Sequence, residues 1–189
     1  MVEVAKVPDC ILKVKQAHQR IATTWRDGGW APPKAAELLR GLNLDRLVSL
    51  AASLEIWTKR PPADQEEGRL VLSWANLGAL VEGTMCWFLC VHEDSYAESP
   101  LINKRGDIIA PDDIWFARLI DFFTSTVLDP VAAQRWRSWL DMVRERRNSI
   151  HAYRRRDLGT FQELRRAIRQ YADFLGDLQS RVPDEPAPD

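Results

Sequence analysis

The apolar stretch 70–91 constrains the fold of this chain more than any other feature. It is long enough to cross a membrane as a helix, and Glu82 is its only formal charge. Asn76 and Glu82 lie near its middle, where an acidic residue costs about 3 kcal/mol on insertion scales. The residues before it, 64–67, are acidic, and those after it, 92–94, supply no basic anchor. We therefore predict a helix from about 65 to 91 that is the buried centre of a soluble bundle.

The rest of the chain also has the pattern of helices separated by turns. Apolar residues recur at helical spacing, and we find no alternation typical of strands. We predict an all-α, antiparallel helical bundle with a long central helix. The other helices are expected at about 9–27, 32–42, 43–59, 112–127, 130 into the region of 150, and 160–179.

A polar, turn-rich loop, 95–113, is expected as an insertion after the central helix. With 189 residues, the chain suits one domain that buries its own core. We assign residues 1–181 to a single helical domain. Residues 182–189 are acidic and rich in proline, so we expect a disordered tail.

Global charge gives no sign of nucleic-acid binding, because 26 basic residues face 27 acidic ones. The local distribution differs. Between 135 and 156 there are eight arginines against Asp141 and Glu145, an excess that could follow a phosphate backbone. An ordinary solvated basic surface is the alternative.

The three cysteines do not form a disulfide framework, which fits a reducing, cytoplasmic location. Cys86 and Cys90 are one helical turn apart, with His92 nearby, but they lie in an apolar run where free cysteine packs as a small hydrophobic residue. We therefore expect no metal and no other cofactor. His18 is expected at the surface or boundary of the first helix.

The run 144–153, with the sequence Arg-Glu-Arg-Arg-Asn-Ser-Ile-His-Ala-Tyr, concentrates groups that can perform chemistry. Histidine exchanges protons near neutral pH, and arginine binds phosphate oxygens. The combination indicates phosphodiester chemistry, with His151 as general acid or base.

The spacing Arg146, four residues, His151, one residue, Tyr153 resembles the R-x4-H-x-Y motif of HepT-type toxins in the HEPN superfamily. The resemblance covers about ten residues. It implies a HEPN-type bundle that forms a homodimer, pairs two motifs across the interface and cuts RNA without a metal, in a toxin–antitoxin or antiviral defence system. It also implies catalytic roles for Arg146 and His151, and makes Tyr153 a candidate for modification by a nucleotidyltransferase-type antitoxin.

The chain departs from the family at one point. The family usually has Asn, Asp or His directly after the motif arginine, whereas Arg147 stands here and Asn148 follows it. On a straight helix Arg144, Arg147 and Asn148 fall within roughly 60° of His151, while Arg146 falls on nearly the opposite face. Either the helix bends here, or Arg144 or Arg147 takes the role of the motif arginine.

Several expectations follow for the residues around the motif. Arg144, Arg147, Asn148 and Tyr153 are predicted to support the site, and Glu82 to pair with an arginine of the motif helix and orient it. The alternatives are an ordinary buried ion pair or an exposed position at the helix edge for Glu82, and a packing role at the helix end for Tyr153. Three arginines that follow the motif are predicted to bind RNA: Arg154, Arg155 and Arg156. The alternative function is a non-catalytic helical module that binds RNA, a nucleotide or a protein partner.

Overall fold

The structure, a computed structural model, describes residues 6–59, 61–151 and 155–184. This part of the chain contains eight α-helices joined by short 3₁₀ and π-helical turns. Its only β-type pairing is an isolated bridge between Ile102 and Ile108. The predicted all-α class is confirmed.

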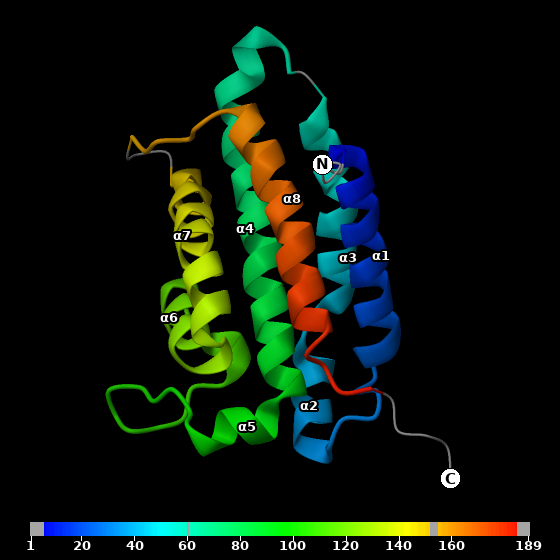
Figure 1. Ribbon diagram of the computed structural model, residues 1–189, viewed down its shortest axis with the longest axis vertical. Helices are drawn as coiled ribbons and strands as arrows, with labels where there is room; N and C mark the ends of the chain where they lie inside the picture. The colour runs from blue at the N-terminus through cyan, green and yellow to red at the C-terminus, as the bar shows by residue number, and fades with distance from the viewer. Residues whose placement is uncertain (1–5, 60, 152–154, 185–189) are drawn as a thin grey trace.

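The long helix α4 (Glu66–Val91) is the centre of the bundle, as predicted (Figure 1). Trp74, Leu77, Leu80 and Met85 on it are completely buried. By length and composition α4 could cross a membrane, but 72% of its most apolar window is buried inside the protein. Its hydrophobicity is accounted for by neighbouring helices that cover it. These are α2 (Pro33–Gly41), α3 (Leu44–Ser53), α7 (Pro130–Arg147) and α8 (Phe161–Gln179).

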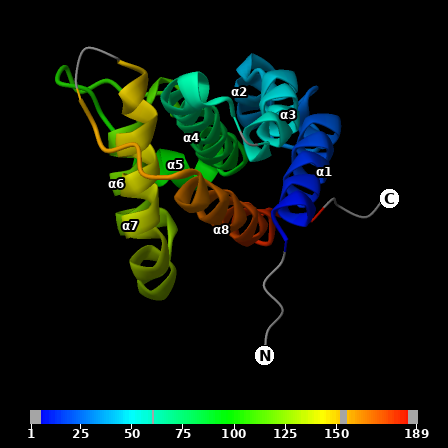
Figure 2. The same ribbon diagram turned by 90° about the horizontal axis from the view of Figure 1, so that it is seen from above.

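The bundle has three layers when it is viewed from above (Figure 2). Helix α7 and the shorter α6 (Phe116–Phe122) form one outer layer. Helices α4 and α8 lie in the middle, and α1 (Val7–Trp25), α2 and α3 form the other outer layer. The short α5 (Glu93–Glu98) follows α4 at the lower end of Figure 1. This arrangement places the end of α7 against α4 and exposes its outer side.

Polar side-chain caps fix where three of the eight described α-helices begin. Asn43 accepts a hydrogen bond from the backbone N–H of Arg46, and Asp129 accepts two such bonds at the start of α7. Thr160 and Glu163 form a reciprocal capping box at the start of α8. These helix starts agree with the sequence prediction.

Three boundaries differ from the prediction. The helix expected over 43–59 is α-helical only as far as Ser53 and continues as a 3₁₀ helix over Leu54–Thr58. The helix expected from 112 begins only at Phe116, because Ile114 and Trp115 adopt extended backbone conformations that bury Ile114 in the core. The segment predicted as a loop from 95 begins inside α5. Of the predicted disordered tail, 185–189 lies outside the described residues.

The prediction that His18 lies at the surface or boundary is wrong. Its side chain is 1% exposed, because it shares the apolar face of α1 with Val14 and Ile21. The ring atom Nε2 lies 2.6 Å from Tyr171 Oη, which is itself 2.7 Å from Thr84 Oγ1. A buried polar network therefore joins α1, α8 and α4.

This network should make stability depend on pH. Burial lowers the pKa of His18 to about 4, whereas an unfolded histidine has a pKa of about 6.5. Below pH 6.5 the unfolded chain binds the proton more readily, so stability falls as the pH drops from 6.5 towards 4. Between pH 7.5 and pH 5 His18 should account for a loss of about 2 kcal/mol in the free energy of unfolding.

Urea unfolding at the two pH values checks this expectation, with His18→Gln as the comparison. The variant lacks the titrating ring, so its stability should change less between pH 7.5 and pH 5 than that of the wild type. An equal change in both proteins would contradict the account.

Candidate functional site at the end of helix α7

Helix α7 changes geometry within the predicted motif. The α-helix ends at Arg147, and residues Asn148–Ile150 form a single 3₁₀ turn before His151. The backbone N–H of His151 donates to the carbonyl of Asn148 at 3.3 Å. The angles of a straight helix therefore hold only as far as Arg147. Tyr153 and Arg154 lie outside the described residues.

Arg147 is held against α4 by Glu82. Its Nη2 lies 2.7 Å from Glu82 Oε2, and its Nη1 lies 3.4 Å from Asn148 Oδ1. Gly78 makes this approach feasible, because a side-chain carbon there would collide with the Arg147 stem. The predicted ion pair between Glu82 and an arginine of the motif helix is confirmed.

Glu82 also receives the backbone N–H of Phe116, at the start of α6. Burial raises the pKa of this carboxyl above its usual range, and the charge of Arg147 and the Phe116 N–H act in the opposite direction. One carboxylate thus fixes two elements, the end of α7 and the beginning of α6.

A pocket of about 380 Å³ lies beside this ion pair. Arg144 and Arg147 are each about one-third exposed at its edge, so a ligand can reach both guanidinium groups. The pocket is lined by Glu82, Trp115, Phe116, Ala117, Arg144, Arg147 and Asn148. Three of the predicted supporting residues, Arg144, Arg147 and Asn148, are therefore brought together here.

A second pocket adjoins the first, and Arg144 and Asn148 line both. Arg146, Arg156 and Asp157 also line it. Arg155 and Arg156, which were predicted to bind RNA, are exposed. The end of α7 is therefore a ridge with a hollow on each side.

Arg146 points away from the first pocket. Its side chain is 10% exposed, and its Nη2 lies 2.8 Å from Glu163 Oε1 in the α8 capping box. Its Cζ lies 4.9 Å from the centre of the Trp74 ring, a cation–π geometry. The hydrogen bond from Arg146 is the main cause that lowers the pKa of Glu163. Arg146 thus fastens the end of α7 to α4 and to the start of α8.

His151 follows the 3₁₀ turn directly, and its side chain is exposed to solvent. It comes three residues after Asn148, the first residue of that turn. The ring is accessible to a substrate, as a general acid or base must be.

The predicted local excess of positive charge is compensated in part by carboxylates from other elements. Arg137 pairs with Asp121 and Asp141, and Arg144 lies within 3.9 Å of both Asp141 and Glu145. The pairs Arg147–Glu82 and Arg146–Glu163 were described above. A count along the sequence could not show that distant carboxylates neutralise this segment.

Sequence reasoning missed Trp115. Its side chain is 79% exposed, although it lines the pocket that contains Arg144 and Arg147. A signal was present, because Ile114, Trp115 and Phe116 are three consecutive large apolar residues. One extended turn of backbone cannot bury all three, and here Ile114 and Phe116 are the buried ones.

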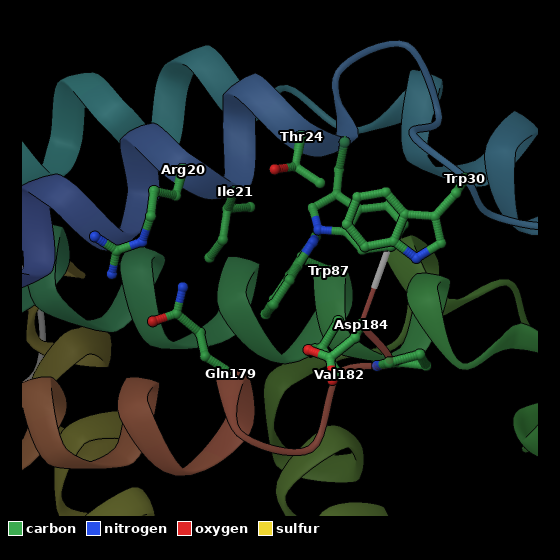
Figure 3. Close-up of a pocket in the computed structure, with 10 residues that line it drawn as sticks. Arg20, Ile21, Thr24, Trp30, Trp87, Gln179, Val182 and Asp184 are labelled. Carbon is green, nitrogen blue, oxygen red and sulfur yellow. The ribbon is translucent and has the colours of Figure 1, made fainter. Parts of the chain in front are cut away.

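Another pocket lies at the opposite end of the bundle, between α1, α4 and the segment after α8 (Figure 3). Trp30 and Trp87 line it together with Arg20 and Gln179. It contains none of the predicted site residues.

Cys86 and Cys90 are packed in the core, where burial raises the pKa of both thiols.

Comparison with known proteins gives no relative: no protein-family model, curated protein or solved structure matches this chain. A functional interpretation therefore depends on the chemistry of the residues at the end of α7 and on the short resemblance to the HEPN motif.

Proposed function

We propose that this protein is a HEPN-type endoribonuclease that does not require a metal. One observation carries the proposal: two reachable guanidinium groups, those of Arg144 and Arg147, share a pocket with Asn148 at the helix end that leads to the exposed His151. Arginine beside histidine is the minimum needed to bind a phosphodiester and transfer its protons.

In this mechanism the ribose 2′-hydroxyl attacks the adjacent phosphorus, and the bond to the 5′-oxygen breaks. His151 removes the proton from the 2′-hydroxyl or supplies one to the leaving oxygen. Arg147, oriented by Glu82, stabilises the negative charge that develops on the phosphoryl oxygens. The product is a 2′,3′-cyclic phosphate.

The arrangement favours Arg147 and Arg144 over Arg146 for the role of the motif arginine. Arg146 is engaged by Glu163 and covered by Trp74, whereas the other two are reachable from the pocket. In this version the main role of Arg146 is to position the helix end, although its side chain also lines the second pocket.

A homodimer completes the proposal. Each protomer contributes one His151. The reaction moves one proton from the attacking oxygen and another to the leaving oxygen, so it profits from two proton-transfer groups on opposite sides of the phosphorus. Two sites facing each other would supply both. We further propose a cytoplasmic toxin–antitoxin or antiviral role, with a nucleotidyltransferase-type antitoxin as partner.

Cleavage of a labelled RNA in the presence of EDTA tests the proposed chemistry. We expect cutting to persist, to leave 2′,3′-cyclic phosphate ends and to spare DNA, which lacks the nucleophile. Complete loss of cutting in EDTA, restored by added metal, would contradict the mechanism.

A non-catalytic binding module is the second candidate, and the ion pairs favour the form of it that binds a protein partner. Carboxylates already accompany Arg144 and Arg147, which weakens their attraction for phosphate. Expression in cells separates the candidates: a ribonuclease should be toxic, and His151→Ala should relieve the toxicity. A binding module should give the same growth with and without that substitution.

A further inference from the structure

The side chain of Trp115 is exposed to solvent although it is large and apolar. Its 79% exposure is the largest among the large apolar residues in the described part of the chain. It precedes α6 at the N-cap position but makes no side-chain capping bond. Burial of an indole would stabilise the fold, so an indole left exposed at the edge of a pocket with two arginines is a candidate contact site.

The backbone beside this indole is linked through Glu82 to Arg147, which is proposed to bind phosphate. Glu82 accepts the N–H of Phe116 and also binds Arg147. The Cζ of Arg147 lies 6.0 Å from the centre of the buried Phe116 ring. Trp115 is therefore held at the rim of the same pocket as Arg144 and Arg147, with its ring directed to solvent.

We propose that Trp115 is a stacking platform for an unpaired base of single-stranded RNA, whose neighbouring phosphate is bound by Arg144 and Arg147. This inference rests on the proposed ribonuclease function and names the form of its substrate. An exposed aromatic ring beside basic side chains is the usual way to hold a single strand, because every base has a face that can stack. Bases inside a double helix are already stacked, so a duplex gains little from such a ring.

The adjoining pocket extends the same path. It shares Arg144 and Asn148 with the first pocket and adds Arg156. A strand stacked on Trp115 can therefore pass over the ridge at the end of α7, close to the exposed His151. A protein partner would also cover Trp115, but it would have no need for two guanidinium groups in the same pocket.

Fluorescence anisotropy with a short labelled single-stranded RNA tests this site. The His151→Ala background keeps the RNA intact, and Trp115→Ala, Trp115→Phe and Leu12→Ala are compared on it. Leu12 is a matched control, since it is also exposed (52%) but lies on α1, on the other side of the bundle.

Trp115→Ala should weaken binding by about five- to 150-fold, the loss of one base stack. Trp115→Phe should weaken it less, and Leu12→Ala should have no effect. A series of RNAs, each with an abasic residue at a different position, should identify one base that is stacked. Removing that base should weaken RNA binding by the protein with Trp115 but not by the Trp115→Ala variant. Double-stranded RNA should bind both proteins equally.

The proposal would be overturned if the protein with Trp115 and the Trp115→Ala variant bound single-stranded RNA with equal affinity. Dissociation of a dimer by Trp115→Ala, with RNA affinity unchanged, would overturn it too and assign the indole to a protein contact. The ribonuclease proposal can fail on its own. If RNA binds through Trp115 but the wild-type protein never cuts it, the ribonuclease proposal is wrong and the stacking site is still supported.

Discussion

Replacing His151 with alanine is expected to slow RNA cleavage by about 100- to 10,000-fold, the usual contribution of a proton-transfer group. The side chain is exposed and lies after the last turn of α7, so its removal should leave the fold intact. Single-turnover cleavage measures the rate, and circular dichroism during thermal unfolding verifies the fold.

His92→Ala is the matched control for this experiment. His92 lies at the far end of α4, against Phe88, and has no part in the pockets beside α7. Its removal should leave the cleavage rate nearly unchanged. His18→Ala is a poor control because it breaks the buried network with Tyr171. Full activity in a folded His151→Ala protein would refute the site assignment.

Replacing Arg146 with alanine should lower the free energy of unfolding by about 2–3 kcal/mol. The substitution removes a side chain that is nearly buried, stacks over Trp74 and binds Glu163 at the start of α8. The effect should be mainly structural, since this side chain joins three helices.

Arg144→Ala is the comparison from the same helix turn. Its guanidinium is partly exposed and its carboxylate neighbours are 3.7 Å and 3.9 Å away, so the free energy of unfolding should change by no more than about 0.5 kcal/mol. The RNA cleavage rate should show the opposite order: when both variants are folded, Arg144→Ala should lose more of the rate than Arg146→Ala. Urea unfolding that gives the same loss of stability for the two variants would contradict this division of roles.

Much of the fold could be predicted from local sequence. Turn residues and caps such as Asn43, Asp129 and Thr160 act within a few residues, so the helix starts that depend on them could be located. The burial of α4 could also be predicted, because its apolar residues leave no polar face for solvent. The position of His18 was open to the same reasoning, since its spacing places it on the apolar face of α1.

The site was less predictable because its contacts join residues distant in sequence. The pair between Glu82 and Arg147 was expected in kind, since a carboxylate in an apolar helix requires a partner. Which arginine pairs with Glu82 was less predictable. Arg146 is held instead by Glu163 and Trp74, which come next to it only after α7, α8 and α4 have packed. Exposure of Trp115 likewise follows from the extended turn that buries Ile114, which no periodic pattern records.

The most direct test of the central claim uses a single-stranded DNA oligonucleotide that contains one ribonucleotide. The wild-type protein, in EDTA, should cut this strand only on the 3′ side of the single ribonucleotide and leave a 2′,3′-cyclic phosphate there, because only that residue carries the attacking hydroxyl. Cleavage at deoxyribonucleotide positions, or an intact strand under conditions in which an all-RNA strand of the same sequence is also left intact, would contradict the assignment of ribonuclease chemistry to the end of α7.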